Sequence, residues 1–186
     1  MNEIITQPTP NPNALKFILE IDVKKDGKTS FKNPKQAKEI PLAAALFDLR
    51  GVDQIHFFQN VITVSKFTFE PWETLENSVR TQIENFIADH DPNFIGHDPE
   101  VERRKHLSGD LLKIEDILDK KIRPGLQGDG GDLRALSLDG DVLLVQYQGA
   151  CGTCPSATTG TLEAIRAILQ DDFDPNIEVY IAPETY

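Results

Sequence analysis

The chain has 186 residues, a net charge of −11 at pH 7, and apolar (39%) and charged (26%) fractions typical of a globular protein. The acidic balance argues against general nucleic-acid binding, which needs a basic surface, and against docking on an anionic membrane. No apolar run approaches the ~18 residues of a spanning helix, and the first residues lack the basic and apolar regions of a signal peptide. We therefore expect a cytoplasmic protein without nucleic-acid or membrane partners.

Residues 1–95 predict a small domain that begins with a strand. Prolines at positions 8, 10 and 12 predict an irregular path for residues 6–13, because proline fixes the backbone and removes a donor. Residues 15–21 alternate between apolar and polar, which predicts a strand. The charged residues 24–28 predict a solvated turn.

The rest of this first domain predicts a helix, a hairpin and a second helix. Residues 35–49 predict a short helix that ends at Gly51, and residues 52–58 and 61–67 predict the two strands of the hairpin. The second helix begins near Trp72 and has one apolar face.

Side chains alternate between the two faces of the first hairpin strand. Ile55 and Phe57 are therefore expected in the core, whereas Phe58 falls on the opposite face with Gln54 and His56. We expect apolar surface exposed near Phe58 to dock client proteins, although a helix covering Phe58 is the simpler interpretation.

Residues 96–107 are polar and charged, which predicts a linker that is helical in part. Residues 108–186 then predict a second domain of class α+β with the order helix, strand, strand, helix, strand. Pro124-Gly125 is expected to end the first helix, and Asp139-Gly140 is a hairpin turn signal. Residues 127–132 predict a loop with a flexible backbone; within it, residues 129–132 lack the further ligands of a calcium loop, so we interpret them as a tight turn with capping carboxylates.

The two cysteines, Cys151 and Cys154, lie three positions apart between the last hairpin strand and a helix. Pro155 is suited to the first helical position, so Cys154 is expected at or next to the helix N-terminus. Unpaired amides and the helix dipole favour the thiolate there, and the thiolate is the form that binds metal. Gly149 and Gly152 leave room for a bulky cofactor or a partner sulfur.

Three interpretations of this pair remain open from the residues alone. Two cysteines are too few for a structural zinc site or a four-iron cluster, but a two-fold dimer supplies four thiolates. A thioredoxin-like dithiol/disulfide oxidoreductase is the alternative, although the preceding strand belongs to a hairpin and not to a β-α-β crossover. An inert buried pair is the third. The histidines all precede this domain and are interpreted as solvated or hairpin residues: His56, His90, His97 and His106.

Residues 122–132 and 149–156 resemble the NifU-like C-terminal domain of Nfu iron–sulfur proteins, and residues 9–17 resemble the opening of the Nfu N-terminal domain. The resemblance implies a scaffold or carrier, not an enzyme, that holds a [4Fe-4S] cluster between two subunits and passes it to apo-proteins. It implies that Cys151 and Cys154 are the ligands. The expected partners are a second copy in the loaded homodimer, apo iron–sulfur clients and upstream assembly proteins.

Overall fold

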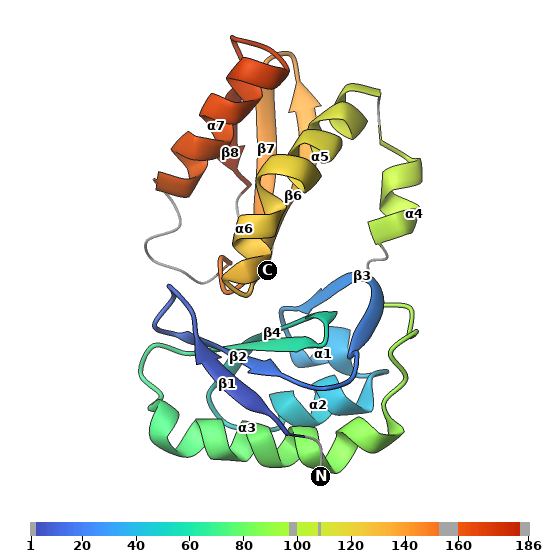
Figure 1. Cartoon of the computed structure of the whole chain (residues 1–186), viewed down its shortest axis with the longest axis vertical. Helices are drawn as coiled ribbons and strands as arrows, with labels where there is room; N and C mark the ends of the chain where they lie inside the picture. The colour runs from blue at the N-terminus through green and yellow to red at the C-terminus, as the bar shows by residue number, and fades with distance from the viewer. Residues whose placement is uncertain (1–2, 97–99, 108, 153–159, 183–186) are drawn as a thin grey trace.

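The computed structural model describes residues 3–96, 100–107, 109–152 and 160–182, which form two domains with a sheet each (Figure 1). Each sheet is packed with helices and has a separate apolar core, so the predicted α+β class with two small domains is confirmed. Within the described residues, no helix is both long and apolar enough to span a membrane.

The first sheet has five antiparallel strands in the order β1-β2-β5-β4-β3. The bounds are Ile5–Pro8 for β1, Ala14–Ile18 for β2, Lys24–Phe31 for β3, Val52–Gln59 for β4 and Val61–Lys66 for β5. The predicted β4–β5 hairpin is confirmed.

Two segments of this sheet correct the sequence prediction. Ile5–Pro8 is a strand, although its proline predicted an irregular path, and Lys24–Phe31 is a strand where a solvated turn was predicted. Both are edge strands, and an edge tolerates a missing N–H and charged side chains. Local sequence signals therefore failed where a strand has only one neighbour.

The helices of the first domain cover one face of this sheet (Figure 1). They are α1 (Pro34–Ala37), α2 (Pro41–Phe47), α3 (Trp72–Phe86) and the short 3-10 helix η1 (Ile87–Asp89). One helix was predicted over residues 35–49, but Pro41 lacks the N–H that would continue it and instead begins α2. Ile55 and Phe57 are buried in this core as predicted, and Phe58 is half-buried.

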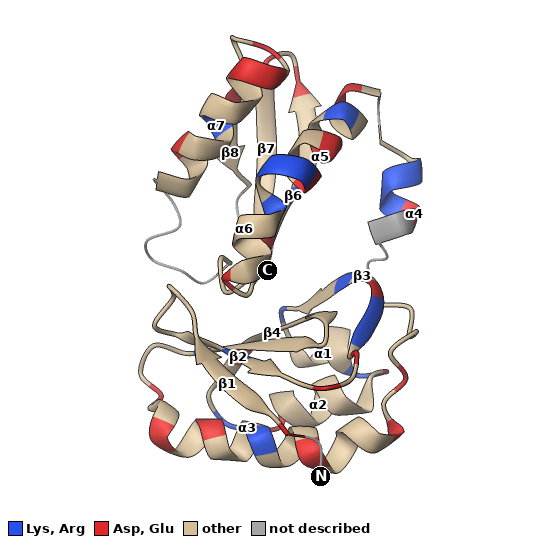
Figure 2. Ribbon diagram, viewed as in Figure 1, with Lys and Arg blue, Asp and Glu red and all other residues tan. Residues whose placement is uncertain are grey.

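Half of the predicted linker is a helix bound to the second domain. Helix α4 (Glu100–Lys105) places Arg103 and Arg104 against Glu115 of α5 (Gly109–Lys121), at 2.6 and 3.2 Å. Arg104 also pairs with Asp119 at 2.7 Å, and charged segments of α4 and α5 are visible in Figure 2.

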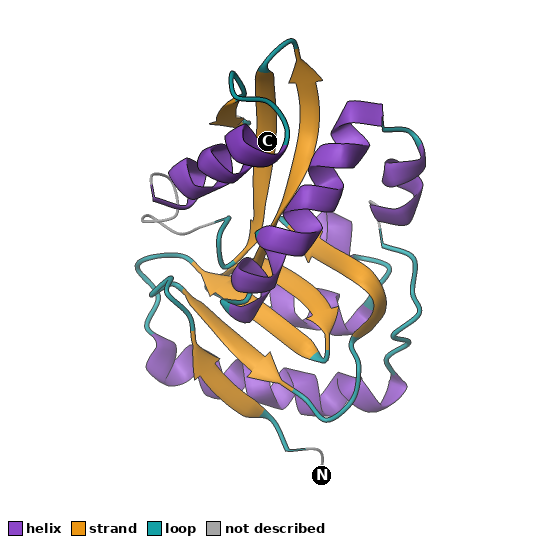
Figure 3. Cartoon of the chain, turned by 45° about the horizontal axis from the view of Figure 1, so that its top comes forward, coloured by secondary structure: helices purple, strands orange, loops and turns teal. Residues whose placement is uncertain are grey.

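The second domain adds α6 (Arg123–Gly128), β6 (Gly131–Asp139), β7 (Val142–Gly149), α7 (Gly160–Asp172) and β8 (Glu178–Ile181). The predicted element order is confirmed, except that α5 ends at Lys121 and Pro124 lies in the first turn of a further helix, α6. The β6–β7 hairpin turns at Gly140, whose φ of +57° suits glycine. Helices α5 and α7 pack on one face of the sheet (Figure 3).

Strand β8 pairs with β7 in parallel, so β7-α7-β8 is a crossover unit. The strand before the cysteines was predicted to belong to a hairpin and not to a β-α-β crossover, which is wrong, because β7 belongs to both. The register of a third strand was not readable from the sequence, since residues 176–181 could pair on either side of the hairpin.

Candidate functional site

The face of the first sheet that is turned away from α2 and α3 carries polar side chains. In the β4–β5 register, Gln54 lies opposite Ser65 and His56 opposite Thr63. Thr63 also lies opposite Lys16 of β2. We term this set the polar sheet face; its members are Lys16, Ser30, Gln54, His56, Thr63 and Ser65.

The cysteine loop, residues 149–152, follows β7 and contains Cys151, which is half-buried. Cys154 and Pro155 lie outside the described residues, so the predicted placement of Cys154 at the helix N-terminus is not described. A Cβ on Gly131 would overlap the Cys151 Sγ. Gly149 has a φ of +59°, and a Cβ there would lie 2.6 Å from the Gly130 oxygen. Gly131 therefore leaves the room that the sulfur occupies, and Gly149 lets the Gly130 backbone approach closely.

The donors around Cys151 do not form a complete metal site in the described part of one chain. No group of three or more His, Cys, Asp or Glu side chains there could hold a metal ion. Tyr147 is buried nearby, and burial raises the pKa of its phenol, with Cys151 contributing in the same direction.

The polar sheet face covers the cysteine loop (Figure 1). A Cβ on Gly152 would lie 3.2 Å from Gln54 Oε1, and one on Gly149 would lie 3.1 Å from His56 Cγ. A Cβ on Gly130 would lie 2.7 Å from the Lys16 side chain. Gly149 and Gly152 in the cysteine loop, together with Gly130 before β6, thus allow close approach of the first domain.

Asn11 binds the cysteine loop directly. Its Nδ2 donates to the Ala150 oxygen at 2.8 Å, and the side chain is buried. The Asn11 Oδ1 accepts from the Asn13 N–H at 2.9 Å, and the Thr9 hydroxyl donates to the backbone carbonyl oxygen of Asn11 at 2.9 Å. The proline-rich segment around residues 9–13 is therefore a self-bonded turn that presents one amide to the loop.

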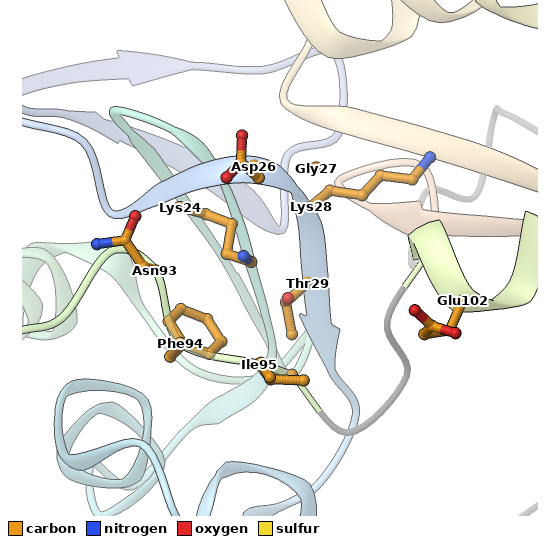
Figure 4. Close-up of a pocket in the computed structure, with 10 residues that line it drawn as sticks. Lys24, Asp26, Gly27, Lys28, Thr29, Asn93, Phe94, Ile95 and Glu102 are labelled. Carbon is orange, nitrogen blue, oxygen red and sulfur yellow. The ribbon is translucent and has the colours of Figure 1, made fainter.

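An ion pair joins the domains on the other side of the loop. Lys28 of β3 reaches toward the second domain (Figure 4) and lies 2.6 Å from Asp132 Oδ1. Its ammonium also donates to the Leu133 oxygen at 3.2 Å. Asp132 is fully buried and also lies 3.3 Å from the Arg123 guanidinium. Asp132 was interpreted as a capping carboxylate in a tight turn, but it lies in β6 and pairs with Lys28 of the first domain.

His56 is buried at 1% exposure, which corrects its interpretation as solvated although it does lie in the predicted hairpin. Its Nδ1 lies 2.7 Å from the Ser30 hydroxyl, and its Nε2 has no partner among the described residues. Burial lowers the pKa of His56 to about 4, with Asp132 opposing and Lys28 reinforcing the shift. His90 is bonded to the Val23 oxygen at 2.7 Å, and His106 is exposed.

Sequence reasoning missed Asn11, Lys28 and Asp132 as groups that join the domains. One sequence signal could have indicated the domain junction: β4 and β5 carry polar side chains on the face opposite the core. The predicted helices of the first domain are needed to cover the apolar face, so a polar face of this kind is free to contact another domain. A cavity of about 260 Å³ lies beside this junction, with Lys24, Phe94 and Glu102 among the residues that line it (Figure 4).

Comparison with known proteins places both halves of the chain. The family "Scaffold protein Nfu/NifU N terminal" matches residues 4–90, and the family "NifU-like domain" matches residues 114–180. The "NFU1 iron-sulfur cluster scaffold homolog, mitochondrial" of Drosophila erecta is 33% identical over 172 residues, which cover 90% of this chain and 60% of that protein. The Homo sapiens protein of the same name is 34% identical over 169 residues, with 90% and 66% covered.

The chain thus spans about 60% of the length of the Drosophila relative. The solution structure of a NifU-like protein from Saccharomyces cerevisiae is 22% identical, with a TM-score of 0.47, and covers 53% of this chain and 87% of that one. With both domain families matched in order along the chain, the protein belongs to the Nfu family of iron–sulfur cluster scaffold proteins.

Proposed function

We propose that the chain is a scaffold or carrier that holds a [4Fe-4S] cluster between two copies of itself and passes it to apo-proteins. Cys151 and Cys154 of each copy supply the four thiolates that such a cluster takes. The observation that carries the proposal is Cys151 on a loop cleared by glycines in a NifU-like domain. The cluster is cargo, so we assign no turnover reaction to the chain.

The proposed partners are apo iron–sulfur proteins and upstream assembly proteins, in line with the scaffold names of the relatives. Client docking by the first domain also remains a proposal. Phe67 and Phe69 are better candidates for this docking than the half-buried Phe58, because their rings stack 5.7 Å apart and are 44% and 78% exposed. A cytoplasmic location is likewise our proposal, whereas the relatives named above are mitochondrial.

The test is anaerobic reconstitution followed by sedimentation of the apo and loaded protein. Loaded wild-type protein should sediment as a dimer with one four-iron cluster per two chains, because each chain contributes only two thiolates. Cys151→Ser removes two of the four ligands from the dimer and should abolish stable loading. A loaded monomer, or a full iron complement in Cys151→Ser, would contradict the bridging arrangement.

A dithiol/disulfide oxidoreductase is the second candidate, and the β7-α7-β8 crossover favours it more than the sequence did. A cysteine pair between a strand and a helix of such a unit is typical of thioredoxin-like sites. Reduction of insulin disulfides by the apo protein, absent in Cys151→Ser, would support this function. A carrier should show no such activity above the free-thiol background.

A further inference from the structure

Most of the polar sheet face is buried, although its side chains are of the kind that face water. An antiparallel sheet with one apolar and one polar face ordinarily leaves the polar face solvated. In this chain Gln54, His56 and Thr63 are between 1% and 9% exposed. The second domain provides the cover, since Gly130, Gly149 and Gly152 all approach this face.

Three polar contacts hold the two domains together at this face, and each comes from a different strand or turn of the first domain. Asn11 Nδ2 donates to the Ala150 oxygen at 2.8 Å. Lys16 Nζ donates to the Gly128 oxygen at 2.6 Å. Lys28 pairs with Asp132 at 2.6 Å. Together the contacts surround the cysteine loop and the turn before β6.

The cover also has a cost, because it buries polar atoms without partners. His56 Nε2 and the Thr63 and Ser65 hydroxyls have no hydrogen-bond partner among the described residues. A buried polar atom that loses water without gaining a partner destabilises the state that buries it. The closed arrangement is therefore held by a few polar contacts against an opposing desolvation cost, which favours opening when those contacts are lost.

We infer that this cover is a reversible latch: the first domain hides the cysteine loop in the apo chain, and the domains must part before a second copy can share a cluster. The inference rests on the proposed function, in which two cysteine loops face one cluster. A second copy cannot approach the side of the loop that Asn11 and Gln54 already occupy. The first domain and the second copy thus compete for the same surface.

The test measures access to Cys151 in the full-length apo chain. The rate of alkylation by iodoacetamide is measured in a Cys154→Ser background, so that a single thiol reacts. Lys28→Met removes the ion pair and keeps most of the apolar stem. Asn11→Asp keeps the acceptor for the Asn13 N–H but loses the donor to Ala150. Alkylation should accelerate by about tenfold in Lys28→Met and about threefold in Asn11→Asp, because both raise the open population.

Each variant has a matched control that makes the same chemical change away from the latch. Lys25→Met lies on the same strand at an exposed position, and Asn33→Asp keeps the N-cap of α1. Both controls should alkylate within about twofold of the parent. The latch variants also make the surroundings of the thiol more negative, which disfavours the thiolate and slows alkylation. Faster alkylation therefore reports opening and not a change in thiol reactivity.

Two independent outcomes separate the latch from the proposed function. If both latch variants alkylate at the rate of their controls, the latch is wrong, whatever the protein binds. If the variants alkylate faster but the wild-type chain never loads a cluster, the cover exists and the carrier proposal fails. The latch predicts in addition that Lys28→Met, with Cys154 restored, forms the loaded dimer faster than Lys25→Met; equal rates would overturn the competition.

Discussion

At the scale of single residues, the glycines around Cys151 have different tasks. Gly131 leaves room for the sulfur of the same domain, because a Cβ there would overlap Cys151 Sγ. Gly130 and Gly152 leave room for side chains of the first domain, Lys16 and Gln54. The glycine-rich pattern in the sequence therefore has two structural reasons: one glycine leaves space for the Cys151 side chain, and others let the two domains pack closely.

Gly131→Ala tests the first of these tasks. The new methyl group must displace Cys151, so unfolding should become easier by about 1–3 kcal/mol, the usual cost of overpacking. Gly128→Ala is the matched control, since nothing lies within 4 Å of a Cβ there, and it should be neutral or stabilising by up to about 1 kcal/mol. Urea denaturation measures both. Equal stability of the two variants would show that Cys151 does not need the space.

At the scale of elements, α4 is held to the second domain by charge. Glu115 of α5 is fully buried and pairs with Arg103, Arg104 and Arg123. Its carboxylate also accepts the Ala135 N–H at 3.0 Å, which ties α5 to β6. The segment predicted as a linker is thus, from Glu100 onward, part of the second domain's framework.

Glu115→Gln should destabilise the second domain by about 1–3 kcal/mol, because the buried Arg123 guanidinium loses one of its charge-assisted hydrogen bonds while Asp119 and Asp132 remain beside it. The amides of α4 should then exchange with solvent faster. Asp116→Asn makes the same change one residue along the helix at an exposed position, and it should stay within about 0.5 kcal/mol of wild type. Hydrogen exchange and urea denaturation check the pair; a Glu115→Gln protein as stable as Asp116→Asn would contradict the role of the charge cluster.

At the scale of the whole molecule, the junction buries a histidine among groups from both domains. His56 faces Lys28 and Ser30 on β3, Thr63 on β5 and Asp132 on β6. Burial lowers its pKa to about 4 from an ordinary value of 6.5. The unfolded chain therefore binds a proton at His56 below pH 6.5, whereas the folded chain does so only near pH 4.

The stability linked to His56 is fully present above pH 6.5 and is lost as the pH falls toward 4. Between pH 7 and pH 5 the expected loss is about 2 kcal/mol. Urea unfolding followed by the fluorescence of Trp72, the single tryptophan of the chain, reports the first domain. His56→Gln should flatten the pH dependence in this window, and His106→Gln, at an exposed position, should not. A slope unchanged in His56→Gln would contradict the buried neutral state.

The sequence by itself determined the elements whose pattern is local. Apolar periodicity located the long helices, the alternation in β4 and β5 identified Ile55 and Phe57 as core residues, and turn signals located both hairpins. The motifs around residues 9–17, 122–132 and 149–156 were enough for the family, because glycine, proline and cysteine spacing is written directly in the chain.

Only the tertiary structure decided what depends on distant neighbours. The edge strands β1 and β3 formed against local signals because a paired neighbour supplied their hydrogen bonds. The parallel register of β8 depended on which side of the hairpin remained open. The pairing of Lys28 with Asp132 and the contact of Asn11 with Ala150 join residues 104 and 139 positions apart. The burial of His56 likewise depends on contact between the two domains. The alternation of apolar and polar residues within one strand shows which side chains share a face, but it cannot show that another domain covers the polar face.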